Sequence, residues 1–343
     1  MSNTSSSRTI IILPDDTKKP IIDAISGAKK SIKIKMFIFS DPDLLAAVIE
    51  AKKRGVAVQV MLNPARRNGE EENEDTRKKL LEAGIEVKDS NPAFGLTHEK
   101  SMVIDEDRAF VKSLNWATKN LTVTRDYAIT TSHLHEVNEI VDCFNADWDR
   151  KTFDPGADAH LIWCTGNGRD KIAHFIDSAK HTLFVQNERY QDSVIIERLV
   201  RAATRGVKVH IMARPAHSLK KDKLVEAVGG LRIMDDVGIK VHTLRHLKLH
   251  GKMLIADGSR AIVGSINLAP GSFDDRRELA IEVHDEDVVE RLHNIAKADW
   301  ENSHPLDLSD EGLFADLEEK GDGGDEKLAL NVKKKKHGDG DDD

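Results

Sequence analysis

The sequence predicts an α/β protein made of two related domains, each a mixed, mostly parallel sheet with helices on both faces. Three observations support this fold class. Strand-like and helix-like segments alternate along the chain, which is typical of such sheets. Short motifs recur in the same order at a spacing of 151 to 154 positions. The length of 343 residues suits two domains, each large enough for its own core.

The first copy opens with a predicted strand, helix and strand. Residues 31–39 alternate and are rich in Ile and Phe, residues 44–53 have helical periodicity, and residues 56–62 form a second apolar run. An Arg-Gly pair ends the helix, as expected where glycine takes the left-handed conformation. A further helix over 75–83 and a short strand beginning Gly-Ile complete this part.

The second copy repeats the pattern. We expect a strand at 182–186, a helix at 194–204, a strand at 207–212 and a helix at 221–228. In both copies a strand and a last helix ending in Asp-Trp follow the central motif. A repeat this long indicates two domains, because the repeats of solenoids are only about 20–50 residues long.

Composition sets the predicted boundaries. A Ser-rich segment opens the chain, Phe-Asp-Pro-Gly-Ala-Asp at 153–158 is the candidate linker, and Gly, Asp and Lys dominate beyond Pro305. Such a tail cannot bury enough apolar surface to fold alone, although 308–317 is compatible with one docked helix. The predicted divisions are a disordered N-terminus (1–8), a first domain (9–153), a second domain (154–304) and a charged, largely disordered tail (305–343).

The motif common to both copies is H-x-K-x4-D followed by S-x-N. An acidic residue follows each motif Asn by eleven positions. Chance would not duplicate the full set in register, so these are the candidate site residues. They are His98, Lys100, Asp105, Ser113, Asn115 and Asp126 in the first copy and His250, Lys252, Asp257, Ser265, Asn267 and Glu278 in the second.

These residue types fit the cleavage of a phosphodiester through a covalent intermediate. Such a substrate is anionic, so a site needs cations and neutral donors around its non-bridging oxygens, which Lys and Asn supply. A neutral imidazole can attack phosphorus, and a protonated one can donate to the leaving alcohol. Two histidines allow both steps in one site. The lysines take the part of a divalent cation, so we expect no metal and no cofactor.

The doubled motif resembles that of the phospholipase D superfamily over residues 9–304. Its members include phospholipases D, cardiolipin and phosphatidylserine synthases, and nucleases. The resemblance implies two phospholipase D-like domains around a pseudo-twofold axis, with one active site per chain, so a monomer suffices. It also implies His98 as nucleophile and His250 as general acid/base, with the reverse order left open by the symmetry of the motif. Lys112 departs from the pattern, which has Gly there, and predicts a changed backbone approach or an extra cation.

The remaining motif residues have expected supporting roles. Lys100, Lys252, Asn115 and Asn267 would bind the phosphate, and Ser113 and Ser265 would bond the phosphate or a histidine. An acidic residue in each copy would orient a histidine through its other nitrogen. The aspartate of each H-x-K-x4-D motif would hold its loop in place without touching substrate. The orienting pair is Asp126 and Glu278, and the loop pair is Asp105 and Asp257.

The substrate class is less well determined. The net charge is −8, but residues 306–343 carry −7 of it, so the rest is nearly neutral and shows no basic excess for nucleic acid. Aromatic residues are only 5%, whereas residues 93–96 offer an apolar loop for a lipid interface. We therefore expect a phospholipid substrate with peripheral membrane contact, and a nuclease is the alternative. Two lone cysteines and no secretory signal favour a cytoplasmic protein.

Several other features have an ordinary explanation. His242, His246 and His250 are spaced for a helical metal site, but this segment alternates like strands, which spreads the three too far apart. Residues 166–169 resemble a phosphate loop, yet a turn before a helix explains them better. Trp116 fits a pocket wall and a core position equally well. A non-catalytic phosphate-binding scaffold is the remaining alternative, and only Lys112 favours it.

Overall fold

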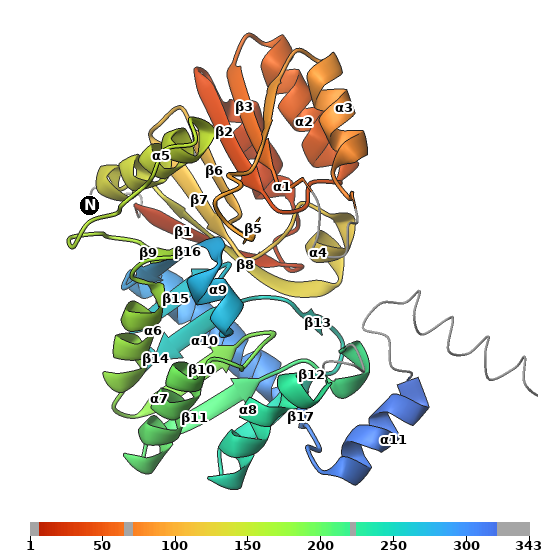
Figure 1. Ribbon diagram of the computed structural model, residues 1–343, viewed down its shortest axis with the longest axis vertical. Coiled ribbons are helices and arrows are strands. Elements are labelled where there is room, and N and C mark those ends of the chain that lie inside the picture. The colour runs from red at the N-terminus through yellow and green to blue at the C-terminus, as the bar shows by residue number, and fades with distance from the viewer. Residues whose placement is uncertain (1–6, 65–70, 220–223, 321–343) are drawn as a thin grey trace, which may run out of the picture.

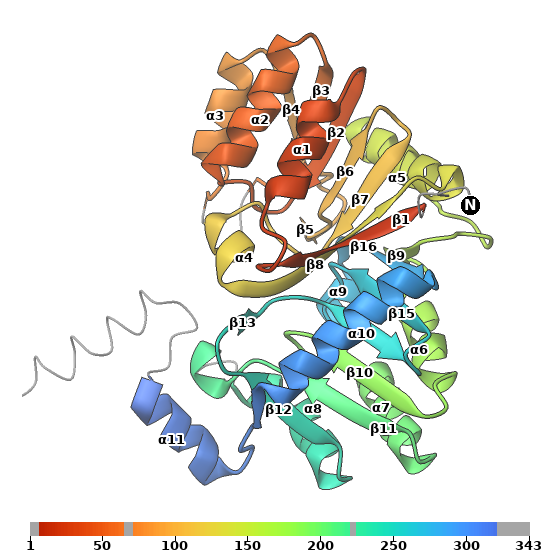
Figure 2. The ribbon, with the colours of Figure 1, turned by 180° about the vertical axis from the view of Figure 1, so that it is seen from behind.

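The computed structural model describes residues 7–64, 71–219 and 224–320. Two mixed sheets, each with helices on both faces, lie one above the other in Figures 1 and 2. Apart from one short strand that each copy contributes to the other sheet, the first sheet is built from the first copy of the repeat and the second sheet from the second copy. The predicted fold class is therefore confirmed.

The first sheet has the strand order β1-β8-β7-β6-β2-β3-β4, and β13 from the second copy pairs with β8. Only the run β2-β3-β4 pairs in parallel along this order, among the residues described. The strands are β1 (Arg8–Leu13), β2 (Ser31–Met36), β3 (Ala57–Leu62), β4 (Glu86–Asp89), β6 (Ser101–Ile104), β7 (Arg108–Lys112) and β8 (Thr124–Thr131).

The second sheet has the order β17-β12-β11-β10-β14-β15-β16-β5, in which β5 comes from the first copy and β9 also pairs with β16. The parallel run β10-β11-β12 corresponds to the parallel run of the first sheet. The strands are β5 (Leu96–Thr97), β9 (Ile162–Cys164), β10 (Thr182–Gln186), β11 (Lys208–Met212), β12 (Lys240–Leu244), β13 (Lys248–Leu249), β14 (Met253–Ala256), β15 (Arg260–Gly264), β16 (Arg276–Val283) and β17 (Ser303–Pro305).

The sheets are mixed, as predicted, but antiparallel pairs outnumber parallel ones within the described residues, so "mostly parallel" was wrong. The antiparallel pairing results from the short connections in the chain after each H-x-K sequence. Tight turns join β6 to β7 and β14 to β15, and a tight turn can only join antiparallel neighbours, because parallel pairing needs a long crossover. The parallel runs are therefore formed by the strands that precede the motifs, and β13 and β5 add one parallel pairing each, with β8 and β16 of the other copy.

Helices cover both faces of each sheet. In the first copy α1, α2 and α3 lie together on one face and α5 lies on the other; in the second copy α6, α7 and α8 face α10 across the sheet (Figures 1 and 2). The helices are α1 (Lys19–Gly27), α2 (Pro42–Lys53), α3 (Glu74–Glu82), α4 (Thr118–Thr122), α5 (Leu134–Trp148), α6 (Gly168–Asp177), α7 (Ser193–Thr204), the 3₁₀ helix η1 (Ala216–Ser218), α8 (Leu224–Asp236), α9 (Pro270–Asp274), α10 (Glu286–Glu301) and α11 (Asp310–Lys320).

The two equivalent helices α2 and α7 begin and end alike. The carboxylate of Asp41 accepts from the backbone of the first turn of α2, and Asp192 does the same for α7. Each helix is followed by a glycine with a left-handed backbone, Gly55 at φ 91° and Gly206 at φ 90°. This matches the helix ends expected from the Arg-Gly pairs.

Three apolar clusters form the core. One lies between the first sheet and α1–α3, and a second lies between the second sheet and α6–α8. The third contains side chains of both copies, among them Tyr127 and Ile129 from β8, Leu279 and Ile281 from β16, and residues of α5 and α10. The two halves are therefore joined by a continuous buried core.

The two ends of the described chain are well anchored. Arg8 begins β1 and pairs with Glu136 and Asp285, and the carbonyl of Ser7 accepts from the backbone N–H of Ser132, so these two residues are ordered, contrary to the prediction. At the other end α11 covers the site of the predicted docked helix, with Leu313 buried. The four consecutive lysines that the sequence has at 333–336 lie outside the described residues. Within the described ranges, no helix has the length and apolar character needed to cross a bilayer.

Candidate active site

The two motif loops meet where the sheets cross over. Short strand β5, just before His98, pairs with β16 of the second copy, and β13, just before His250, pairs with β8 of the first. The backbone N–H groups of His98 and Glu99 both donate to the carbonyl of Arg277, and that of Gly251 donates to the carbonyl of Arg125. This reciprocity is what a pseudo-twofold relation produces.

Each histidine is held by the acidic residue of the other copy. Nδ1 of His98 lies 2.9 Å from Oε2 of Glu278, and Nδ1 of His250 lies 2.8 Å from Oδ1 of Asp126. Both carboxylates are fully buried. With Nδ1 occupied, the Nε2 atom of each ring is left for chemistry, which is the arrangement of an oriented catalytic imidazole. The structure thus brings the predicted histidines and their predicted orienting residues together.

The surroundings of His98 keep its ring neutral. Burial lowers the pKa of His98 to about 3, with Glu278 opposing the shift and Lys100 adding to it. His98 is therefore neutral at pH 7, and its Nδ1–H donates to the ionised carboxylate. The edge of the Phe37 ring packs against His98, with the ring centroids 5.0 Å apart.

The motif lysines lie buried beside the histidines. Nζ of Lys100 donates to the carbonyl of His98 at 2.6 Å, and Lys252 donates to the carbonyl of His250. Burial, and then repulsion from Lys252, lower the pKa of Lys100 to about 7. The repulsion that Lys100 experiences indicates that the ammonium groups of the two motif lysines lie close to each other.

The motif asparagines are also buried, with 5% of Asn115 and 4% of Asn267 exposed. Oδ1 of each has no hydrogen-bond partner among the described residues. Since a buried amide group is normally satisfied, two such groups at equivalent positions point to a ligand. An Oδ1 atom accepts hydrogen bonds and so suits a hydroxyl group of a ligand, whereas the predicted contact with an anionic phosphate needs the Nδ2–H donors of the same side chains.

The motif serines are engaged with the strands that carry the orienting acids. Ser113 Oγ donates to Asp126 at 2.6 Å and accepts from the backbone N–H of Tyr127. Ser265 Oγ donates to the carbonyl of Leu279 and accepts from its N–H. This geometry favours a positioning role for the serines over the predicted phosphate contact.

The motif aspartates hold loops away from the histidines. Asp105 accepts from the backbone N–H groups of residues 29–31, and Asp257 from those of 180–182. Burial would raise the pKa of each carboxyl, but these hydrogen bonds outweigh it and keep both below their usual range. This is the structural role expected of them, tying each motif turn to the start of β2 or β10.

One site residue, Glu188, escaped the sequence analysis. It follows β10, and its Oε2 lies 2.6 Å from Nζ of Lys252 and 3.9 Å from Nε2 of His250. Its Oε1 lies 3.1 Å from Nη1 of Arg214. The available signal was its place at the carboxyl end of a central parallel strand, where ligands bind in open α/β sheets.

Two buried ion pairs join the copies next to the histidines. Arg125 pairs with Asp299, and Arg277 pairs with Asp147. All four residues belong to dipeptides that recur 152 positions apart and serve as anchors of the repeat: Arg-Asp at 125–126 with Arg-Glu at 277–278, and Asp-Trp at 147–148 and 299–300. In each Arg-Asp/Glu dipeptide the arginine and the acid both reach across to the other copy, so these anchors build the interface and orient the site at once.

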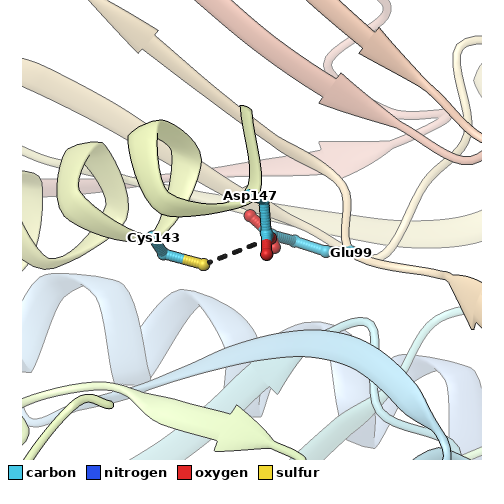
Figure 3. Close-up of side chains that lie close together, drawn as sticks. All are labelled: Glu99, Cys143 and Asp147. Carbon is cyan, nitrogen blue, oxygen red and sulfur yellow. Dashed lines mark hydrogen bonds between the residues drawn. The ribbon is translucent and has the colours of Figure 1, made fainter. Parts of the chain in front are cut away.

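A cluster around Asp147, the acid of the second pair, has the donor atoms of a metal site. Glu99, Cys143 and Asp147 converge (Figure 3). The ammonium of Lys35 lies 2.8 Å from Glu99 and 2.7 Å from Asp147, so a buried cation already neutralises the carboxylates. Burial raises the pKa of the Cys143 thiol above its usual range, which disfavours a thiolate ligand. His242 lies in β12, where it stacks on Trp300.

Lys112 replaces the motif glycine without distorting the pairing. It lies opposite Ala128 in β8, just as Gly264 lies opposite Ala280. A Cβ at Gly264 would lie 2.3 Å from the carbonyl oxygen of Leu279, so the second copy requires glycine there. The Lys112 side chain is fully buried over the ring of Trp116, and among the described residues its Nζ finds no hydrogen-bond partner.

Burial, and then Lys100, hold the pKa of Lys112 well below its ordinary value, which favours a neutral amine over an extra cation. We expect Lys112→Met to stabilise the fold by about 1–3 kcal/mol, because it removes an unsatisfied buried polar group. At a pH below the ordinary lysine pKa, Lys112 is protonated in the unfolded chain and must lose its proton on folding, which destabilises the fold. The stabilisation by Lys112→Met should therefore be larger at pH 6 than at pH 10. Urea unfolding at both pH values measures it.

Lys119→Met, on the exposed surface of α4, is the matched control for that substitution. A loss of activity in Lys112→Met at unchanged stability would show instead that Lys112 serves the phosphate.

The other predicted features also have defined places. Trp116 is fully buried against Phe39, a core position. In the 93–96 loop Phe94 covers the guanidinium of Arg277 at 4.2 Å and Leu96 is buried, so the loop packs on the second copy. Residues 166–169 form the turn that begins α6, as expected.

Comparison with known proteins agrees with this architecture. The family model described as cardiolipin synthase, PLD-like domain, matches residues 21–148 and again residues 172–300. Fold and site together define an enzyme of the phospholipase D superfamily. Within it, the chain belongs to the PLD-like family that this model describes.

Three relatives illustrate the range of the similarity. Cardiolipin synthase B of Escherichia coli K12 is 25% identical, over 81% of this chain and 78% of that protein. A polyphosphate kinase of Vibrio parahaemolyticus is 24% identical, over 82% of this chain and 42% of that protein. The structure of phosphatidylserine synthase from Haemophilus influenzae covers 97% of this chain and 94% of its own, with a TM-score of 0.68 and 14% identity, a likeness of fold.

Proposed function

We propose that this protein is a phosphatidyltransferase or phospholipase D that cleaves a phospholipid phosphodiester through a phosphohistidine. The observation that carries the proposal is the pair of buried histidines, each held at Nδ1 by a carboxylate of the other copy. Water or an alcohol then takes the phosphatidyl group. The site lies within one chain, so a monomer suffices.

His98 is assigned as the nucleophile and His250 as the general acid/base. A nucleophile must be unprotonated, and burial keeps His98 neutral throughout the physiological range. His250 has a second carboxylate, Glu188, near its Nε2, which suits a group that passes a proton between leaving alcohol and acceptor. Lys100, Lys252 and the two motif asparagines stabilise the oxygens of the phosphorane-like transition state.

The choice of lipid rests on the relatives and on charge. The E. coli relative is a cardiolipin synthase, and the body of this chain is nearly neutral. The carboxylate of Glu188 within the site also opposes a polyanion. Peripheral contact with a membrane is part of the proposal, because the substrate lies in a lipid surface.

The deciding assay uses phosphatidylglycerol vesicles, deuterated glycerol and excess EDTA, with products identified by mass spectrometry. We expect phosphatidic acid, labelled phosphatidylglycerol or cardiolipin from the wild type and none from His98→Asn. Unchanged lipid would refute the proposal, and single-stranded DNA and RNA would then be the next substrates to try.

The pKa of Lys100 predicts a pH dependence. A lysine with a pKa of about 7 loses its charge as the pH rises through 7, so kcat/KM should fall about tenfold per pH unit on the alkaline side. Lys100→Arg keeps its charge, so its kcat/KM should stay constant with pH beyond pH 9, whatever the absolute value. Profiles from pH 5 to 9.5 measure this. A wild-type plateau up to pH 9 would contradict it.

A further inference from the structure

We propose that Glu188 selects the acceptor: its carboxylate binds one hydroxyl of a vicinal polyol while His250 takes the proton of the neighbouring hydroxyl. The acceptor class would then be a 1,2-diol, such as a glycerol head group. The inference rests on the proposed function and specifies the acceptor for the same site.

The position of the carboxylate fits this role. Oε2 of Glu188 lies 3.9 Å from Nε2 of His250, so adjacent hydroxyls of one small molecule can reach both atoms. A carboxylate offers about four lone-pair positions. The contacts with Lys252 and Arg214 use two of them, which leaves acceptor capacity facing the histidine.

Lys252 also retains a donor for the phosphate. An ammonium has three N–H donors. The carbonyl of His250 takes one and Glu188 takes another. The bound phosphate and the acceptor can therefore occupy the site together without displacing Glu188.

The first copy has no such group. The strand pairings of β2 and β10 make Phe37 the counterpart of Glu188. The ring of Phe37 packs beside His98 and lies 5.3 Å from Nζ of Lys100. An aromatic ring accepts no strong hydrogen bond from a hydroxyl, so the acceptor-binding carboxylate belongs to the His250 half of the site. That is the half to which the proposed mechanism assigns the base.

Glu188 is also firmly held. Arg214, which bonds its Oε1, donates in turn to the hydroxyl and carbonyl of Ser218 in η1. The backbone N–H of the neighbouring His217 donates to the carboxylate of Asp316 at 2.8 Å, which ties η1 to α11. A carboxylate fixed in this way is preorganised for its ligand, as specificity requires.

The test is a competition between ethylene glycol and ethanol for phosphatidyl groups from phosphatidylglycerol vesicles. The ratio of the two phosphatidyl products depends only on how the common phosphoenzyme partitions, so it is insensitive to the rate at which that intermediate forms. We expect the wild type to prefer the diol. Glu188→Gln should lower the ratio about tenfold or more, the size of a hydrogen bond to a charged group.

Two further variants complete the experiment. Glu188→Asp keeps a carboxylate but draws it back, so its ratio should fall between wild type and Glu188→Gln. Glu50→Gln, on the exposed face of α2, should leave the ratio unchanged. If Glu188→Gln does not fold, the Asp variant decides.

Two outcomes overturn the inference, and they are distinguishable. A diol ratio that stays at the wild-type value in the Glu188 variants, even with both products reduced, means that Glu188 only neutralises Lys252; the proposed function survives. No phosphatidyl product from the wild type with either alcohol or with water removes the proposed function, and this inference with it.

Discussion

Replacing His98 with asparagine should lower turnover by at least about 10⁴-fold, because the group that forms the covalent bond to phosphorus is lost. The substrate of choice is a p-nitrophenyl phosphodiester, whose leaving group needs no proton. With the wild type, a burst of p-nitrophenolate equal to the enzyme concentration should accompany a mass increase of the protein. His98→Asn should give neither.

The companion variant His250→Asn tests the assignment of the two roles. It should still give the burst, because His98 is present and the leaving group departs unaided, and it should then stall as the phosphoenzyme. A burst from His98→Asn together with none from His250→Asn would reverse the roles. His284→Asn, on an exposed histidine, serves as the control for the substitution itself.

Removing Asp147 should have the largest effect on stability. Asp147 is fully buried and lies between two cations, 2.7 Å from Lys35 and 3.1 Å from Arg277. Asp147→Ala would leave Arg277 buried without this carboxylate and Lys35 with Glu99 alone, which costs about 3–5 kcal/mol. Chemical unfolding at pH 7 measures the loss, with Asp149→Ala, an exposed neighbour, as the control.

The pKa of Asp147 gives this prediction a pH dependence. Burial would raise it, but Lys35 and Arg277 together lower it to about 2. The stabilisation of the folded state by the Asp147 carboxylate is therefore complete above the ordinary pKa of an aspartate, and it is lost as the pH falls toward 2. The difference between wild type and Asp147→Ala should shrink in acid. A difference below about 1 kcal/mol at pH 7 would show that the cluster relaxes by admitting water.

Much of the fold could be predicted because its signals are local. Hydrophobic periodicity, the Arg-Gly helix ends and the repeated motif are each formed by residues that lie close together in the sequence. The proportion of parallel pairing could not be predicted in this way. It depends on the tight turns between β6 and β7 and between β14 and β15, whose effect on the sheet is not visible in hydrophobic periodicity.

The site residues were predicted more fully than their connections. Asp126 lies the same distance along the chain from its own motif as Glu278 does, so spacing alone cannot tell whether an acid serves its own histidine or the other. Only the crossing of β5 and β13 onto the opposite sheets settles it. Glu188 belongs to no repeated pattern, since its counterpart is Phe37, and comparison of the copies therefore passed over it.

The exchange of Asp126 and Glu278 between the histidines has a consequence for how such a gene can change. A mutation of Glu278, in the second copy, first changes the orientation of His98, in the first copy. Loss of the acidic residue from either copy would therefore impair the histidine of the other copy, so neither copy can become inactive by itself. After duplication the two halves stay under a shared constraint, free to diverge at positions such as 37 and 188 but bound to keep each other's histidine in place.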